Sequence, residues 1–151
     1  MIEKFGEFTP RDMETVKQYE TLFNNAGRLL SKVFTLAITE VKFALLKGQD
    51  WQPYRGWHFK FKECRCWYGV SLAGQDFLSV RFQVMLDEEK ISKLSVLKDQ
   101  GYQEFSWIEV GGNWLWKGQP SHMLGVSDKD RQVRICTDIL KEHLFAVESV
   151  L

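Results

Sequence analysis

Apolar residues near the N-terminus recur at spacings of three and four, which is typical of one face of a helix. Thr9, Pro10 and Asp12 form a good helix start, and Gly48 is a natural stop. The predicted helix has roughly 38 residues and a length of about 57 Å, which exceeds the width of a domain this size. We therefore expect either a break near residues 24–27 or a projecting part that packs on a partner. The face comprises Val16, Tyr19, Phe23, Ala26, Leu30, Val33, Ala37, Val41 and Ala44.

The period then changes to two, which indicates half-buried strands. Three such strands are predicted, at residues 57–62, 66–73 and 77–86. A tight turn at Cys64 and Arg65 and a second turn at 73–76 separate them. Since parallel neighbours need a long crossover, these short turns predict an antiparallel meander.

The pattern of the remaining residues, 87–151, predicts a short helix, two strands and a final helix. Asp87 caps a helix running from about Glu88 to Gln100, which Gly101 ends. A strand at 102–110, a hairpin at Gly111-Gly112 and a short strand at 113–117 follow, then a loop at 119–125. Ser127 or Asp128 caps the last helix. Its apolar face carries Val133, Cys136, Leu140, Leu144 and Val147.

The predicted fold is a single α+β domain spanning residues 1–151. A long N-terminal helix and a C-terminal helix flank a mostly antiparallel five-stranded sheet, with a short helix between strands 3 and 4. The element order is α-β-β-β-α-β-β-α.

Charge and cysteine content narrow the function classes. Twenty basic residues cancel twenty acidic ones, so the basic excess that drives nucleic-acid binding over a whole surface is missing. The three cysteines are an odd number, which favours free thiols in a reducing compartment. The start lacks a leader pattern, and no stretch approaches the roughly 20 apolar residues of a membrane span. We expect a cytoplasmic protein without membrane contact.

Recognisable catalytic patterns are absent from the sequence. Cys64 and Cys66, with Cys136 and the three histidines, do not have the spacing of zinc ligands. Nucleophile elbows and glycine-rich phosphate loops are also missing. Asp87, Glu88 and Glu89 suit a helix start, with Asp76 in the preceding turn. We therefore assign no catalytic residue, no metal site and no cofactor.

Tryptophan is the most informative residue type, because six occur in 151 residues. Core packing is our first interpretation of these aromatic residues. A protein interface is the second, because Trp, Tyr and Arg anchor interfaces, and stacking on a ligand or nucleic acid is the third. The interface candidates are Trp51, Tyr54, Arg55, Trp57, Trp114 and Trp116.

A second set of candidates is basic and lies on the polar side of the predicted sheet. We interpret this side mainly as a solvated sheet face, and otherwise as a patch for phosphates or an acidic partner. The set comprises His58, Lys60, Lys62, Arg65 and Arg81.

Three hypotheses about function follow. The first is a non-enzymatic protein-interaction module, such as an inhibitor, immunity protein, chaperone or assembly factor, that uses the long amphipathic helix and the aromatic clusters. It predicts a protein partner or a homodimer. The second is a nucleic-acid-associated protein that uses the basic and aromatic sheet face. The third is an enzyme whose site is not visible as a motif.

Overall fold

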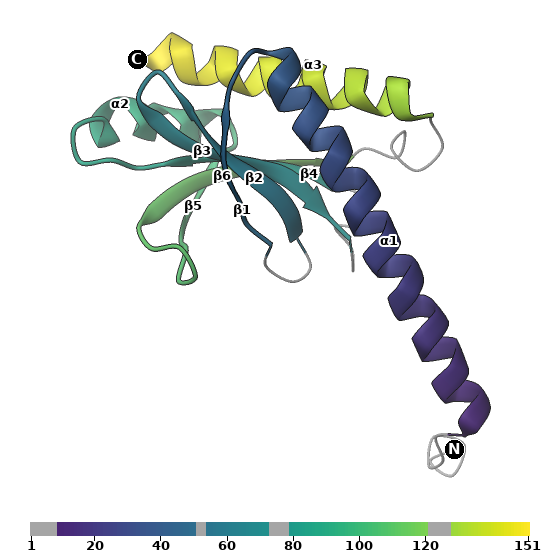
Figure 1. Cartoon of the computed structure of the whole chain (residues 1–151). Coiled ribbons are helices and arrows are strands. Elements are labelled where there is room, and N and C mark those ends of the chain that lie inside the picture. The colour runs from purple at the N-terminus through teal and green to yellow at the C-terminus, as the bar shows by residue number, and fades with distance from the viewer. Residues whose placement is uncertain (1–8, 51–53, 73–78, 121–127) are drawn as a thin grey trace.

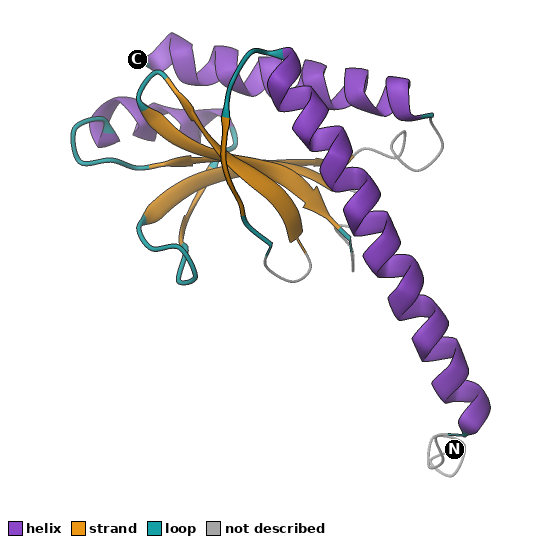
Figure 2. Cartoon of the chain, in the orientation of Figure 1, coloured by secondary structure: helices purple, strands orange, loops and turns teal. Residues whose placement is uncertain are grey.

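A computed structural model describes residues 9–50, 54–72, 79–120 and 128–151. It confirms the α+β class. One antiparallel sheet of six strands has the order β1-β2-β3-β4-β6-β5, and two long helices lie on one side of it (Figures 1 and 2). The elements are α1 (Pro10–Glu40), β1 (Leu45–Gly48), β2 (Tyr54–Phe61), β3 (Cys64–Ser71), β4 (Ser79–Met85), α2 (Ile91–Leu94), the 3-10 helix η3 (Ser95–Gln100), β5 (Gln103–Ser106), β6 (Asn113–Pro120) and α3 (Lys129–Val150).

Helix α1 begins as the sequence predicts. Thr9 is the N-cap and Pro10 occupies the first turn. The Asp12 amide donates to the Thr9 hydroxyl oxygen at 3.2 Å, and the Thr9 amide donates to the Asp12 carboxylate at 2.9 Å. These reciprocal hydrogen bonds satisfy amides that the first helical turn leaves without partners. The helix is continuous through residues 24–27, so of the two expectations the break is wrong.

Helix α1 ends eight residues before the predicted stop at Gly48. The amide of Lys42 donates to the carbonyl of Thr39, and the amide of Phe43 donates to that of Ile38. This pair of bonds is the Schellman arrangement, in which the residue after the C-cap adopts a left-handed conformation. Lys42 takes that conformation, with φ of 66°. Glycine at this position would have indicated the end of the helix, whereas lysine does not. The helix end could therefore not be predicted from the sequence.

The residues freed by this early stop form a sixth strand. Leu45–Gly48 make β1, which pairs with β2 at the edge of the sheet through Leu45↔Phe59 and Gly48↔Trp57. We predicted five strands because Ala44 and Leu45 continue the spacing of the helix. The register shifts between Leu45 and Lys47, so this edge strand carries an irregularity.

The antiparallel meander is confirmed for β2, β3 and β4. The turn between β2 and β3 lies at Lys62 and Glu63 instead of at Cys64 and Arg65, which belong to β3. Both turn residues have positive φ, 51° and 63°, which is the backbone of the tight hairpin turns that match strand twist. The predicted turn at 73–76, including Asp76, lies outside the described residues.

The predicted helix from Glu88 to Gln100 is shorter and divided. Lys90, rather than Asp87, is the N-cap of α2, and η3 follows directly. The predicted strand at 102–110 is also shorter, because β5 stops at Ser106. The backbone then turns: the Trp107 amide donates to the Gly112 carbonyl at 3.1 Å, and the Gly111 amide donates to the Trp107 carbonyl. Strand β6 extends beyond the predicted 113–117 to Pro120.

The main core lies between the sheet and the helices α1 and α3. Asp128 caps α3, as the sequence predicts, with its side chain accepting from the Arg131 amide. The Tyr68 hydroxyl, on β3, donates to the Cys136 carbonyl of α3 at 2.6 Å. On the same side, the Tyr102 hydroxyl and His143 Nδ1 are hydrogen-bonded at 2.6 Å. These bonds satisfy buried polar groups where the helices meet the sheet.

Candidate functional site

A second, smaller core covers the sheet face that is turned away from α1 and α3. Trp67, Trp107 and Trp114 form it and are buried. The rings of Trp107 and Trp114 meet edge to face, with centroids 5.1 Å apart, a preferred arrangement of aromatic pairs. We call these three residues the tryptophan cluster. The predicted core role of tryptophan therefore holds for these three side chains.

The ring of Trp67 packs on two glycines that pair across neighbouring strands. Gly56 and Gly69 face each other across β2 and β3. A Cβ on Gly56 would lie 2.3 Å from the Trp67 ring, and one on Gly69 would lie 2.2 Å from the carbonyl oxygen of Arg55. The indole of Trp67 thus lies where side chains would otherwise stand, and its Nε1 donates to the Gln49 carbonyl at 3.2 Å.

His58 belongs to this covered face. We predicted that it is solvated, and the structure shows that this is wrong. Its side chain is fully buried, and its ring stacks on Trp107 with centroids 5.4 Å apart. Burial, followed by the nearby Arg65 charge, lowers the pKa of His58 to about 4. His58 is therefore neutral at pH 7 and contributes no positive charge to a surface patch.

Arg81 is likewise packed into the face. Its guanidinium carbon lies 4.0 Å from the ring centroid of Trp116, 5.1 Å from that of Tyr54 and 5.0 Å from that of Phe105. Its Nε donates to Gln83 Oε1 at 2.6 Å. Aromatic faces attract a cation in this geometry. Arg81, 9% exposed, therefore ties β4 to β2, β5 and β6.

The other basic candidates do not assemble with these two into one exposed patch. Lys60 and Lys62 are exposed, and Arg65 is half-buried. Lys62 lies in the β2–β3 turn, and its Nζ is 3.4 Å from Glu148 Oε1, with both side chains more than half exposed. The expectation of a solvated basic face thus holds for the lysines and is wrong for His58 and Arg81.

The aromatic interface candidates are also divided among several environments. Trp51 lies outside the described residues. Tyr54 and Trp116 pack on Arg81 and are half-buried, whereas Trp114 is buried in the tryptophan cluster. Half-buried Trp57 packs against the main core on the opposite face of the sheet. We did not single out Trp67 and Trp107 from the sequence. The alternation of Trp67 with Cys66 and Tyr68 could have placed Trp67 on the other side of the sheet.

The cysteines are buried free thiols in the structure. Burial raises the pKa of Cys64 and Cys66, and it raises that of Cys136 to about 12. Protonated, enclosed thiols are poor nucleophiles and poor metal ligands. Within the described ranges, no group of three or more His, Cys, Asp or Glu side chains could hold a metal ion.

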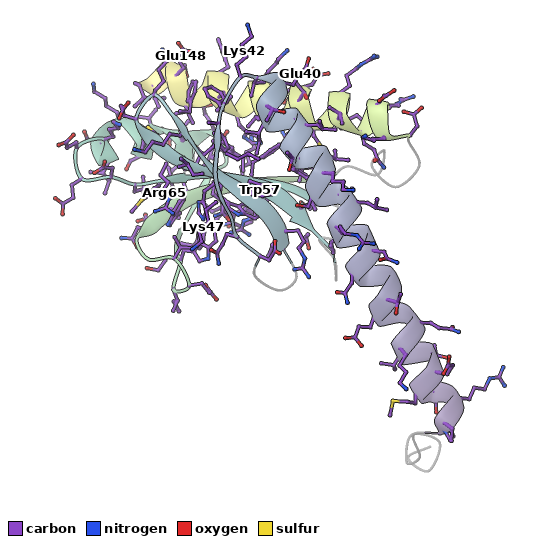
Figure 3. All side chains as sticks on the ribbon, in the orientation of Figure 1. Glu40, Lys42, Lys47, Trp57, Arg65 and Glu148 are labelled. Carbon is purple, nitrogen blue, oxygen red and sulfur yellow. The ribbon has the colours of Figure 1, made fainter. Side chains whose placement is uncertain are left out.

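The N-terminal part of α1 has a different character from the rest of the molecule. Every described side chain from Pro10 to Leu29 is exposed, and burial begins at Leu30. Figures 1 and 3 show this segment extending away from the sheet and α3. It spans 20 residues, or about 30 Å at 1.5 Å per residue. We call residues 10–29 the projecting segment of α1.

The projecting segment is not purely polar. Met13, Val16 and Leu29 are 46%, 49% and 60% exposed. Val16 opens the apolar spacing that continues along the sequence into the buried turns at Leu30 and Val33. Exposed apolar side chains of this kind are candidates for contact with another chain.

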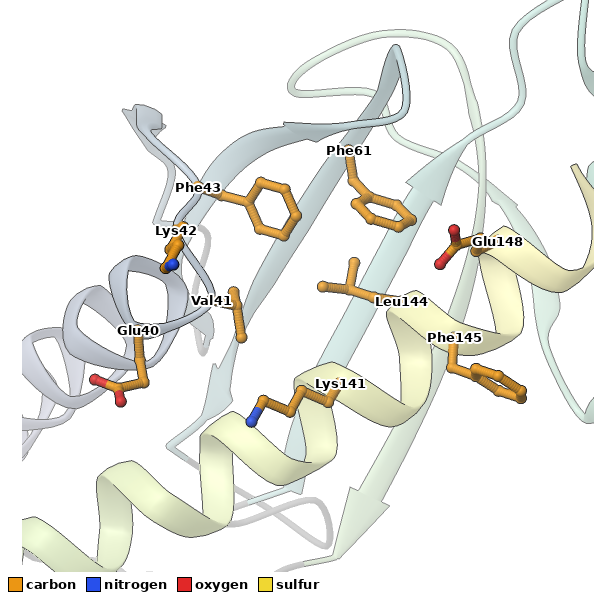
Figure 4. A pocket seen from close by; sticks show the side chains of 9 residues that line it. All are labelled: Glu40, Val41, Lys42, Phe43, Phe61, Lys141, Leu144, Phe145 and Glu148. Carbon is orange, nitrogen blue, oxygen red and sulfur yellow. The ribbon is translucent and has the colours of Figure 1, made fainter.

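A groove lies where α1 ends and α3 passes over the sheet (Figure 4). Its volume is about 360 Å³. Val41, Phe43, Phe61 and Leu144 gather at its centre, while Phe145 points away and is 75% exposed. Charged side chains lie around them, namely Glu40, Lys42, Lys141 and Glu148. The groove adds an apolar surface on the same side of the sheet as α1.

Comparisons with known proteins identify no relative. No family model, no curated protein and no solved structure matches this chain. Among the described residues, none of the helices has the length and apolar character needed to cross a membrane.

Proposed function

We propose that this protein is a non-enzymatic protein-interaction module, of the kind found in inhibitors, immunity proteins, chaperones and assembly factors. Its contact element is the projecting segment of α1. The observation that carries the proposal is the exposure of every described side chain of this segment, apolar ones included, on a helix whose other half buries one face against the core. An amphipathic helix that lies in a partner's groove, or pairs with another helix, is a common mode of protein recognition.

The other two hypotheses have less support. A nucleic-acid role was to use the basic sheet face, yet His58 is neutral and buried and Arg81 is enclosed by aromatic rings. An enzyme typically places titrating groups with shifted pKa values in a deep pocket. Both histidines have lowered pKa values, but His58 is buried against Trp107. His143 borders a pocket of about 230 Å³, yet its side chain is buried, stacks on Phe82 and is hydrogen-bonded to Tyr102.

Val16→Asp tests the proposal directly. Val16 is exposed on the apolar side of α1, so we expect the variant to fold with unchanged stability and to lose its complex. Burying one valine is worth about 1.5 kcal/mol or more, so affinity should fall by at least about tenfold. Native mass spectrometry and analytical ultracentrifugation of the gently purified full chain measure the complex.

Thr21→Asp is the matched control, because Thr21 is exposed on the same segment, away from the Val16 side. It introduces the same charge and should leave the complex intact. A chain that stays monomeric at all concentrations and purifies without another protein would refute the proposal. Equal loss of the complex in both variants would mean that added charge, and not the apolar face, is responsible.

A further inference from the structure

A second groove lies between the middle of α1 and the strands β1 and β2. Its volume is about 420 Å³, within the range of about 300–1,000 Å³ that is typical of small-ligand sites. Most of the side chains that line it are polar or charged. Helix α1 contributes Asn24, Arg28, Ser31, Lys32 and Thr35, and the sheet side contributes Asp50, Arg55 and Trp57.

The helical spacing explains why this wall of α1 is polar. Residues 24, 28, 31 and 35 follow one another at intervals of three and four, so they share one face of the helix. The buried residues Leu30, Val33, Phe34 and Ala37 lie on another face, toward the main core. The same turns of α1 therefore pack on the core with one face and line the groove with the next.

The groove carries an excess of positive charge. Among the described residues that line it are three cations, Arg28, Lys32 and Arg55, and one carboxylate, Asp50. The Arg28 Nη2 donates to the Asn25 amide oxygen at 2.9 Å, which orients the guanidinium without neutralising it. In the part of the chain that the structure describes, no carboxylate lies within ion-pair distance of Arg28 or Lys32.

Arg55 strengthens the positive potential of the groove, because its side chain is sheltered from water. Its side chain is 14% exposed, while that of Asp50 is 60% exposed and lies 3.8 Å away. A contact at that distance with an exposed carboxylate is a weak ion pair. Arg55 Nη1 also donates to the Tyr54 carbonyl at 3.2 Å, a neutral acceptor that leaves the charge of the guanidinium in place. A sheltered guanidinium acts on a nearby anion more strongly than an exposed one, because solvent screens it less.

Trp57 provides a surface of another kind. Its ring is half-buried beside the groove. Its Nε1 is buried and has no hydrogen-bond acceptor among the described residues. An indole offers a flat apolar face for a planar group. The groove thus combines a cationic wall with an aromatic one.

We propose that this groove binds a phosphate ester that carries a planar ring, of the size of a mononucleotide. The phosphate oxygens contact Arg28, Lys32 and Arg55, and the ring lies against Trp57. Guanidinium groups match phosphate geometry through paired hydrogen bonds, and a lysine adds a point charge. This site is separate from the apolar contact surface of the projecting segment and does not depend on it.

Titration calorimetry of the full chain with AMP, adenosine and inorganic phosphate tests the site. We expect AMP to bind more tightly than either fragment, because only AMP offers both the ring and the phosphate. Arg28→Glu and Lys32→Glu, both on the exposed side of α1, should each weaken AMP binding by about tenfold or more. The indole N–H signal of Trp57, assigned in NMR spectra with Trp57→Phe, should shift when AMP is added.

Lys17→Glu is the matched control, because Lys17 is an exposed lysine of α1 outside the groove. It makes the same change in net charge as Lys32→Glu and should alter AMP affinity less than about twofold, since screening weakens distant charges. Absence of AMP binding at millimolar concentration overturns the proposal. If Lys17→Glu weakens AMP binding as much as Lys32→Glu does, the effect comes from net charge and the proposed site is wrong. Phosphate that binds as tightly as AMP, with an unmoved Trp57 signal, overturns the ring contact.

Discussion

At the scale of single residues, three of the described non-glycine residues adopt backbone conformations that glycine accepts more readily. Lys42 closes the Schellman arrangement of α1, and Lys62 and Glu63 form the β2–β3 turn, all with positive φ. Each costs free energy, because Cβ approaches the following carbonyl oxygen in the left-handed region. The pattern of hydrophobic residues does not depend on these backbone conformations. Neither the end of α1 nor the β2–β3 turn could therefore be placed from the sequence.

Lys42→Gly should therefore stabilise the protein. The side chain is exposed, and its removal relieves the left-handed strain of about 1 kcal/mol. Urea unfolding followed by circular dichroism would show a higher midpoint with an unchanged slope. Lys47→Gly on β1 is the control, since Lys47 is exposed and does not have a positive φ, and it should not raise the midpoint. A midpoint that falls in Lys42→Gly would mean that the lysine side chain itself stabilises the helix end.

At the scale of elements, the sequence predicts the kinds of element better than their ends. The start of α1, the meander and α3 were predicted because caps, alternation and short turns are local signals. Strand β1 was missed because Ala44 and Leu45 continue a helical spacing. Strand β5 was predicted too long because the Trp107–Gly112 turn depends on backbone hydrogen bonds that the sequence does not display. The candidate site residues were the least predictable, because which sheet face is covered depends on where the β5–β6 loop folds.

Helix α1 should show two levels of protection in hydrogen exchange. Its buried half packs on the core, whereas the projecting segment relies on its own hydrogen bonds, and an isolated helix of this length is marginal in water. In dilute monomer we expect amides of residues 14–28 to exchange at least about tenfold faster than those of 33–38, by mass spectrometry. Raising the protein concentration, or adding the partner, should slow the first group only. Equal protection along the whole helix in the monomer would contradict this assignment.

At the scale of the whole molecule, the two histidines that the structure describes are buried on opposite faces of the sheet. His143 of α3 stacks on Phe82, with centroids 4.8 Å apart, and His58 stacks on Trp107 on the other face. Burial, with a smaller contribution from Lys117, lowers the pKa of His143 to about 3, and that of His58 is about 4. Both layers of the fold therefore require a neutral imidazole.

Stability should consequently fall in mildly acidic solution. The unfolded chain takes up protons at these histidines near pH 6.5 and the folded chain does not, so stability is complete above pH 6.5 and is lost as the pH falls toward 4. Between pH 7.0 and 5.5 we expect a loss of about 2 kcal/mol in the free energy of unfolding, measured by urea titration. His143→Phe should show a smaller loss over the same interval. An unchanged free energy at pH 5.5 would mean that both rings accept protons in the folded state.

The edges of the sheet have a consequence for how copies of this protein behave when crowded together. Both outer strands, β1 and β5, are only four residues long, and β1 is irregular and carries the exposed Lys47. Edge strands that are short, irregular and charged pair poorly with a strand of another molecule. Concentrated solutions should therefore resist fibril formation.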